Sequence, residues 1–243
     1  MQFQLLPSTD LCQDARFDER LIGLAAENGP TACVWESRQG LVVPRTYQRH
    51  ANFSASCASF AAQGWPVTVR QSGGGIVPQG AGIINLSMAY AVEGKPLDHS
   101  NNAYLLICHV MSEALREFGI ASHPQAVEGS FCDGRYNLAV GHGPSAKKIA
   151  GTAQLWRRQA GTTSADARQI VLVHGLILAE IDCAALTRLA NRFEQSLGTE
   201  KRYSSDKIAS LHDLITPAGT GGGLPFTRVL NAALERQILS LQD

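Results

Sequence analysis

The sequence predicts an α+β fold in which helices flank a central sheet that is mostly antiparallel or mixed. Helical and strand-like segments follow one another without the regular rhythm of β–α–β units, and several strand candidates have hairpin-like spacing. No repeat with the period of a solenoid occurs. With 243 residues, 44% of them hydrophobic, the chain is long enough for one large domain or for one domain with a small appendage.

The first half of the chain is expected to alternate between helices and strands. Apolar residues recur at helical spacing in the helix candidates, and Gly64 and Gly119 follow two of them as expected stop signals. Runs that are β-branched or alternately apolar indicate the strands. The predicted helices are 14–27, 52–63 and 101–118, and the predicted strands are 32–35, 41–43, 67–70 and 83–90.

The second half begins with further strands. Segments 137–140 and 148–155 are predicted strands on either side of a loop, and 170–178 is an almost continuous apolar strand. Asp182 is a suitable N-cap, which predicts a helix over 182–193.

The character of the chain changes after residue 197, where it becomes polar and loop-like. We therefore expect a main domain at 1–197 and a small helical extension, packed on it, at 198–243. The extension is predicted to contain a short helix at 206–211, a Gly-rich linker at 217–223 and an amphipathic helix at 225–241.

Composition excludes several classes of function. Lys plus Arg and Asp plus Glu both number 21, so no net charge attracts the chain to nucleic acid or to an anionic membrane. The longest apolar runs are well below the roughly 20 residues of a membrane span, and the N-terminus has no signal-peptide pattern. The six cysteines are scattered without a C-x-x-C pair, which predicts no disulfide framework, no metal site and a cytoplasmic location.

The segment 130–154, SFCDGRYNLAVGHGPSAKKIAGTAQ, contains residues suited to acyl transfer. It brings a thiol at Cys132, the lysines Lys147 and Lys148, and a small-residue turn at 150–153 into one short span. Acyl transfer requires a nucleophile and a cation that stabilises negative charge. The alternative is a strand, a loop and a second strand that carry an incidental, buried cysteine.

A Gly-rich stretch follows the predicted strand 67–70. Arg70 is followed by Ser72 and by glycines at 73–75, whose N–H groups are able to hold an anion or a carbonyl oxygen, with Arg70 as a further donor. The stretch matches neither a P-loop nor a dinucleotide fingerprint. The alternative is a hairpin turn that happens to be rich in glycine.

Two separated segments together resemble one known family. Residues 70–87, RQSGGGIVPQGAGIINLS, resemble the signature R-R-x-S/T-G-G-G-x-V-x-H-x-x-G-x-x-N-x-S of lipoate-protein ligases and octanoyltransferases. Residues 147–154, KKIAGTAQ, resemble the second signature of that family, G-R/K-K-I/V-x-G-S/T-A-Q, and His174 with Gly175 resembles its later His-Gly pair. The chain departs from the pattern at Gln79 and Gly80, where the family usually has a histidine and often an acid.

The resemblance implies the fold of the catalytic module of biotin and lipoate protein ligases, which is like that of class II aminoacyl-tRNA synthetases. It also implies a tunnel for an acyl chain beside the Gly-rich loop. Carried over by motif, Cys132 and Lys148 are the expected catalytic residues. The residues expected to bind substrate are Arg70, Ser72, Gly73, Gly74, Gly75, Asn85, Gly151, Thr152, Ala153 and His174.

The choice between transferase and ligase depends on Cys132. Residues 130–138, SFCDGRYNL, resemble the S-Y/F-C-x-G-x-Y-D/N-L stretch of cysteine-dependent octanoyltransferases, whereas ligases usually have G-R-N-D-L there without a thiol. The short stretch after residue 197 also favours a transferase, since many ligases carry an extra C-terminal domain.

The transferase hypothesis implies that an octanoyl or lipoyl group passes through a Cys132 thioester to a lysine of an acceptor lipoyl domain, without a cofactor. The expected donor is a carrier protein or a protein of the glycine-cleavage H type. Two alternatives stay open. One is an ATP-dependent lipoate-protein ligase that uses ATP and Mg²⁺ to form lipoyl-AMP, and the other is a non-catalytic binder of acyl groups or carrier proteins.

Overall fold

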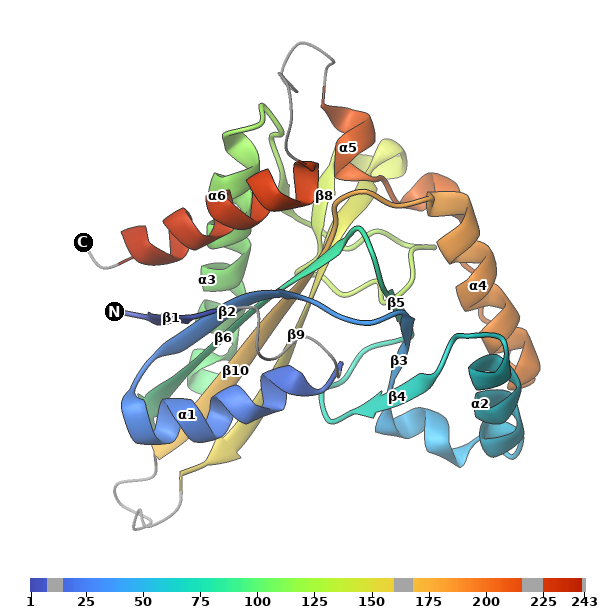
Figure 1. The fold of residues 1–243 in the computed structure, drawn as a ribbon, viewed down its shortest axis with the longest axis horizontal. Helices are drawn as coiled ribbons and strands as arrows, with labels where there is room; N and C mark the ends of the chain where they lie inside the picture. The colour runs from blue at the N-terminus through green and yellow to red at the C-terminus, as the bar shows by residue number, and fades with distance from the viewer. Residues whose placement is uncertain (8–14, 160–167, 216–224, 242–243) are drawn as a thin grey trace.

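The fold is built around a seven-stranded sheet, in a computed structural model that describes residues 1–7, 15–159, 168–215 and 225–241 (Figure 1). Strand β1 is parallel to β2, and the other neighbours in this sheet are antiparallel. The predicted α+β class is therefore confirmed. In spatial order the strands are β1 (Gln4–Leu6), β2 (Thr31–Glu36), β6 (Ile83–Glu93), β10 (Arg168–Leu178), β9 (Lys147–Arg158), β8 (Leu138–Val140) and β7 (His123–Pro124).

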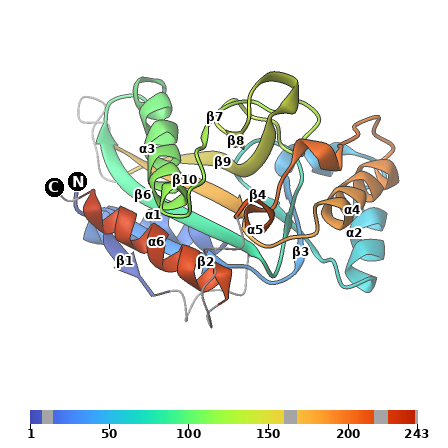
Figure 2. The same cartoon turned by 90° about the horizontal axis from the view of Figure 1, so that it is seen from above.

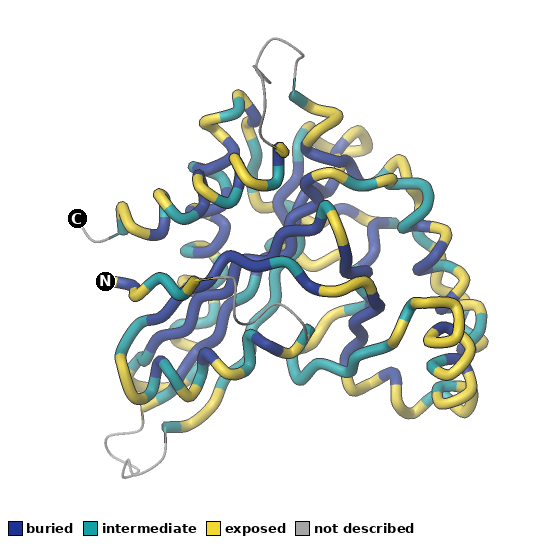
Figure 3. Tube along the Cα trace, in the orientation of Figure 1, coloured by how far each residue is buried: buried dark blue, intermediate teal, exposed yellow. Residues whose placement is uncertain are grey.

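Both faces of the large sheet are covered by helices (Figures 1 and 2). Helices α3 (Pro96–Arg116) and α6 (Phe226–Ser240) pack together on one face, where Val34 of β2 is buried. Helix α1 (Leu21–Asn28) packs on the other face, where Trp35 is buried. Because successive side chains of a strand point to opposite faces, β2 contributes apolar residues to both layers. The central strands are accordingly buried along most of their length (Figure 3).

A second, three-stranded sheet lies beside the first, with the order β4 (Val67–Arg70), β3 (Gly40–Pro44) and β5 (Val77–Gln79). Helices α2 (Phe53–Ala62) and α4 (Cys183–Ser196) pack on it, and the rings of Phe60 and Phe193 meet edge to face with centroids 5.0 Å apart. The predicted N-cap of the helix after Asp182 is confirmed, since the Asp182 side chain accepts a hydrogen bond from the Ala185 N–H.

Several predicted boundaries differ from those in the structure. The first helix is a 3-10 turn, η2 (Phe17–Arg20), followed by α1, and position 14 lies outside the described residues. Helix α3 begins at Pro96 instead of residue 101, because proline is well tolerated at the first position of a helix. Strands β1, β5 and β7 were not predicted, since two or three residues are too few to show alternation.

The short helix predicted at 206–211 is wrong. The chain instead forms the 3-10 turn η5 (Ser205–Lys207) and the one-turn helix α5 (Leu211–Leu214). Between them Ile208 forms a bridge to Lys148 of β9, and the Ala209 N–H donates to the Lys148 carbonyl at 2.9 Å. Pairing with a strand edge requires extended backbone, so a continuous helix is excluded there. The predicted linker at 217–223 lies outside the described residues.

The terminal helix α6 is joined to the core of the large sheet. Phe226 packs edge to face on Phe118 with ring centroids 5.4 Å apart, and Leu230 and Leu234 are fully buried. Two further 3-10 turns, η3 (Arg45–Arg49) and η4 (Gly143–Ser145), complete the described elements. Among the residues that the structure describes, no helix has the length and apolar character to cross a membrane.

Candidate active site

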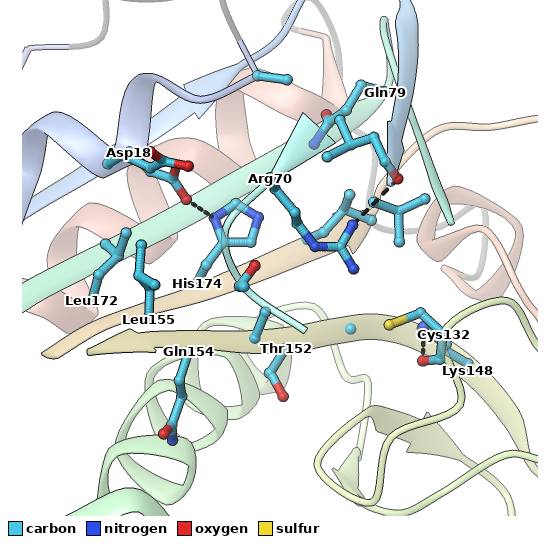
Figure 4. Close-up of a pocket in the computed structure, with 18 residues that line it drawn as sticks. Asp18, Arg70, Gln79, Cys132, Lys148, Thr152, Gln154, Leu155, Leu172 and His174 are labelled. Atoms are coloured by element: carbon cyan, nitrogen blue, oxygen red, sulfur yellow. Dashed lines mark hydrogen bonds and ion pairs between the residues drawn. The ribbon is translucent and has the colours of Figure 1, made fainter. Parts of the chain in front are cut away.

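A pocket lies where strands of both sheets meet the loop that carries Cys132 (Figure 4). Its lining combines apolar and polar side chains, and Figure 4 shows Leu155 and Leu172 beside Asp18 and His174, with Arg70 nearer the middle. Figure 4 shows Cys132 and Lys148 at one side and Asp18 with His174 at the other. The apolar part is formed by Val42, Val77, Leu155, Leu172 and Leu176.

The structure brings most of the sequence-predicted residues together. Those that line this pocket are Arg70, Ser72, Cys132, Lys148, Gly151, Thr152, Ala153 and His174. The predicted glycines Gly73, Gly74 and Gly75 line a second, adjoining cavity, which also contacts Cys132, Thr152 and Ala153. Cys132 therefore lies at the boundary between an apolar pocket and a cavity with charged groups, including Asp133 and Lys201.

Arg70 holds the Gly-rich loop through hydrogen bonds to its backbone carbonyls. Its guanidinium donates to the carbonyls of Gly73 and Gly75 at 2.8 Å each and to the carbonyl of Val42 at 3.2 Å. Burial lowers the pKa of Arg70, but a guanidinium stays protonated in proteins. The cation thus fixes the loop conformation through the backbone and adds positive charge close to the thiol.

Cys132 has an unusual backbone conformation and a directed thiol. Its φ of 54° lies in the left-handed region, which a residue with a Cβ rarely adopts. Its Sγ accepts a hydrogen bond from the Gly75 N–H at 3.3 Å. Gly74, with φ of 104°, leaves the space for this sulfur, since a Cβ there would lie 2.6 Å from Sγ. The loop glycines therefore give the thiol both room and a hydrogen-bond donor.

Lys148 is buried, with a relative exposure of 1%, beside the same cysteine. Its ammonium donates to the carbonyls of Phe131 and Cys132 at 2.6 and 2.9 Å. Burial lowers the pKa of Lys148 to about 8, because a charged amine loses the solvation of water there. Gly151 makes this position possible, since a Cβ on it would be 2.9 Å from Nζ.

Asn85 does not line the pocket but supports its wall. It lies opposite Trp35 in the sheet and exchanges two amide hydrogen bonds with Gln79, at 2.8 and 3.1 Å. Both side chains are buried. Gln79, which stands where the family has a histidine, thus satisfies Asn85 and lines the pocket without a titratable group.

His174 closes the far end of the pocket together with partners that the sequence analysis missed. Its Nδ1 is 3.2 Å from an Asp18 carboxylate oxygen and 3.0 Å from the Ser87 hydroxyl, which in turn accepts from the Trp35 indole N–H at 3.0 Å. The strand register places His174 opposite Ser87. Asp18 lies near the start of the chain, outside the two signatures at 70–87 and 147–154, so no motif marked it as a site residue.

Thr152 and Asn137 hold the loop that carries Cys132. The Thr152 hydroxyl donates to the carbonyl of Tyr136 at 2.9 Å, and the Asn137 amide donates to the carbonyl of Cys132 at 3.1 Å. Asn137 was not predicted as a site residue. Among the described residues, no group of three or more His, Cys, Asp or Glu side chains is arranged to hold a metal ion.

Comparison with known sequences gives relatives of two kinds. An uncharacterised protein of Cupriavidus necator is 47% identical over 201 residues, which cover 82% of this chain and 79% of that one. An octanoyl-[GcvH]:protein N-octanoyltransferase of Kyrpidia tusciae is 30% identical over 199 residues, which cover 82% of this chain and 66% of the relative.

Comparison with solved structures gives a similar fold at low identity. A lipoate-protein ligase A bound with ATP superposes with a TM-score of 0.68 at 16% identity, covering 100% of this chain and 86% of that one. A lipoate protein ligase from T. acidophilum with bound lipoic acid gives 0.67 at 15% identity, with the same coverage. Residues 13–220 match the model of the lipoyl protein ligase A/B catalytic domain, and the chain therefore belongs to that family.

Proposed function

We propose that this protein is an acyltransferase of protein lipoylation, which moves an octanoyl or lipoyl group to the acceptor lysine of a lipoyl domain through a thioester on Cys132. The observation that carries the proposal is the position of Cys132. Its sulfur accepts the Gly75 N–H, and the residue lies where an apolar pocket meets a second cavity. The name of the Kyrpidia tusciae relative, an octanoyltransferase, supports the same chemistry.

In the first step the Cys132 thiolate attacks the carbonyl carbon of the donor-bound acyl group. A bond forms between Sγ and this carbon, and the bond from the carbon to the donor breaks. The leaving atom of the donor, a thiol sulfur or a lysine nitrogen, takes up the proton that the thiol released. The acyl chain lies in the apolar pocket, where its burial contributes about 0.8 kcal/mol for each methylene group.

Negative charge on the carbonyl oxygen is stabilised in this step by the Lys148 ammonium. Two of its three protons bind the carbonyls of Phe131 and Cys132, and the third is available to the acyl oxygen. The Gly75 N–H instead bonds Sγ. In the second step the neutral amine of the acceptor lysine attacks the thioester, the Sγ–carbon bond breaks, and the amine proton returns to the sulfur.

Intact-mass spectrometry tests the thioester. We expect the wild type to gain one acyl group from an octanoyl donor protein and to lose it to an apo lipoyl domain, whereas Cys132→Ser forms no adduct. Cys183→Ser is the matched control, because Cys183 is also partly exposed but lies at the start of α4. A wild type that stays unmodified, or a Cys132→Ser variant with full transfer activity, would contradict the proposal.

Adding ATP to the same assay separates the alternatives. The transferase needs no cofactor, whereas an ATP-dependent ligase, with lipoyl-AMP held by Lys148 and the Gly-rich loop, requires ATP and Mg²⁺. A ligase releases pyrophosphate from lipoate and ATP and is indifferent to Cys132→Ala. A non-catalytic binder retains the acyl group or the carrier protein but transfers nothing under either condition.

A further inference from the structure

Cys132 is held in a backbone conformation that its own side chain disfavours. Of the residues that the structure describes, it alone combines a side chain with a positive φ. Such a conformation persists only where the surroundings impose it, and such positions are concentrated at functional sites. The groups that bind the Cys132 carbonyl are therefore the ones to consider as holding Cys132 in this conformation.

Three donors converge on the Cys132 carbonyl oxygen. The Lys148 ammonium lies at 2.9 Å, the Gly134 N–H at 3.0 Å and the Asn137 side-chain amide at 3.1 Å. Lys148 also donates to the preceding carbonyl, that of Phe131, at 2.6 Å. A carbonyl oxygen has two lone pairs, so three donors on one oxygen is a dense arrangement.

Asn137 is well placed to act as the fixed part of this arrangement. Its relative exposure is 1%, and its own backbone groups are bonded to Gly134 and Gln125, at 3.1 and 2.8 Å. Asn137 directly precedes β8, in which Ala139 pairs with Lys148 of β9. The β8–β9 register shifts between Leu138 and Ala139. The two side-chain donors on the Cys132 carbonyl therefore come from β9 and from the residue just before the neighbouring strand β8.

The orientation of the thiol follows from this backbone geometry. With the carbonyl held by Asn137 and Lys148, the Sγ points to the Gly75 N–H, and Gly74 has no Cβ to obstruct it. Released from these donors, Cys132 would relax toward a negative φ, which turns its Cα–Cβ bond away from the glycines. The N–H donor that favours the thiolate would then be lost.

We propose that Asn137 is a positioning residue that, together with the Lys148 ammonium, holds Cys132 in the left-handed conformation and so keeps its thiol against the Gly75 N–H. The catalytic consequence rests on the proposed function of Cys132. The conformational claim does not, because it concerns the free enzyme.

The rate of Cys132 alkylation by iodoacetamide, measured by peptide mass spectrometry on the folded chain, tests the proposal without any acyl donor. In Asn137→Ala and in Asn137→Leu, which keeps a similar shape, removes the donor and adds no charge, we expect alkylation to slow by about fivefold to tenfold, the factor that one hydrogen bond commonly contributes. Asn231→Ala is the matched control, because Asn231 lies on α6 and lines neither cavity. Folded Asn137 variants that react as fast as the wild type, or faster, overturn the proposal.

Unfolding midpoints give a second readout. Glycine adopts a positive φ without strain, so Cys132→Gly is expected to be more stable than Cys132→Ala, and this difference should shrink in the Asn137→Ala background. An equal midpoint for Cys132→Gly and Cys132→Ala would contradict a strained Cys132.

Acyl transfer separates the two proposals. If Cys132 forms the thioester, the Asn137 variants should lower kcat by about the same factor as alkylation and leave the KM for the acceptor domain unchanged. An enzyme that is never acylated, but whose alkylation depends on Asn137, would remove the proposed function and leave the positioning role intact. An enzyme that is acylated equally well without the Asn137 amide would remove the positioning role and leave the proposed function intact.

Discussion

At the Cys132 end of the pocket the polar side chains hydrogen-bond to the backbone, whereas at the Asp18 end they hydrogen-bond to one another. Arg70 and Lys148 each donate to carbonyls of the loops beside the thiol. At the opposite end, the His174 side chain contacts the Asp18 carboxylate (Figure 4) and the Ser87 hydroxyl, so that the three form a network of side chains.

The difference separates two tasks. Donors on backbone carbonyls fix the conformation of a loop, and with it the direction of one reacting atom, which is what a nucleophile requires. A network of side chains satisfies its own polar groups and forms the end of an apolar pocket, which affects which acyl chains fit. We therefore expect changes at the first end to alter the reactivity of Cys132 and changes at the second end to alter acyl binding.

The largest effect is expected from Gly74→Ala. The added Cβ would lie 2.6 Å from the sulfur of Cys132 and 2.9 Å from the Arg70 guanidinium, at a φ of 104°. We expect formation of the acyl-enzyme to slow about 100-fold, since a displacement of about 1 Å in a reacting group has effects of that size. Gly73→Ala is the control, because its Cβ has no neighbour within 4 Å. If rapid-quench mass spectrometry gives both variants the same rate, the loop does not set the position of the thiol.

A smaller and different effect is expected from Asp18→Asn. It removes the charged partner of His174, and we expect the KM for the acyl donor to rise about tenfold, the size of one charge-assisted hydrogen bond. Alkylation of Cys132 should stay at the wild-type rate. Glu19→Gln is the control, because Glu19 also lines the pocket but pairs with Arg16. Since an exposed ion pair contributes little, this variant should change the KM for the acyl donor by less than about twofold. Slower alkylation in Asp18→Asn would show that the two ends are coupled.

The smallest effect is a pH dependence of stability that arises from Lys148. Burial lowers the pKa of Lys148 from 10.5 to about 8, so above pH 8 the folded chain releases a proton that the unfolded chain keeps. The free energy of unfolding of the wild type should therefore increase from pH 7 to pH 9, by about 1 kcal/mol relative to Lys148→Met, and the contribution should level off near pH 10.5.

Urea unfolding at several pH values measures this difference. Lys147→Met is the control, because Lys147 is exposed and its replacement should leave the pH profile of the wild type unchanged. Parallel profiles for the wild type and Lys148→Met would mean that folding does not lower the pKa of Lys148 and that the side chain keeps its proton in the fold.

At the Cys132 end the motif residues could be predicted from the sequence, whereas at the Asp18 end His174 could be predicted but its partners Asp18 and Ser87 could not. Arg70, the glycines of the loop and Lys148 occur in two spans with distinctive spacing. Asp18 lies outside the segments that resemble the family signatures, and it is distant in the sequence from His174, which it contacts in the fold. The hydrogen bond between Gln79 and Asn85 could not be predicted either, because a departure from a motif does not show which side chain the new residue will contact.

The sequence by itself determined which chemical groups are available and which local conformations are allowed. A thiol, a cation and a run of glycines are properties of residue type, and tolerance of a positive φ belongs to glycine wherever it stands. Only the tertiary structure decided which groups meet. The register of β10 sets His174 opposite Ser87 on one side and Ala153 on the other. The pairing of β8 with β9 brings Lys148 and Asn137 to the carbonyl of Cys132, because hydrogen bonds between distant residues depend on how strands align.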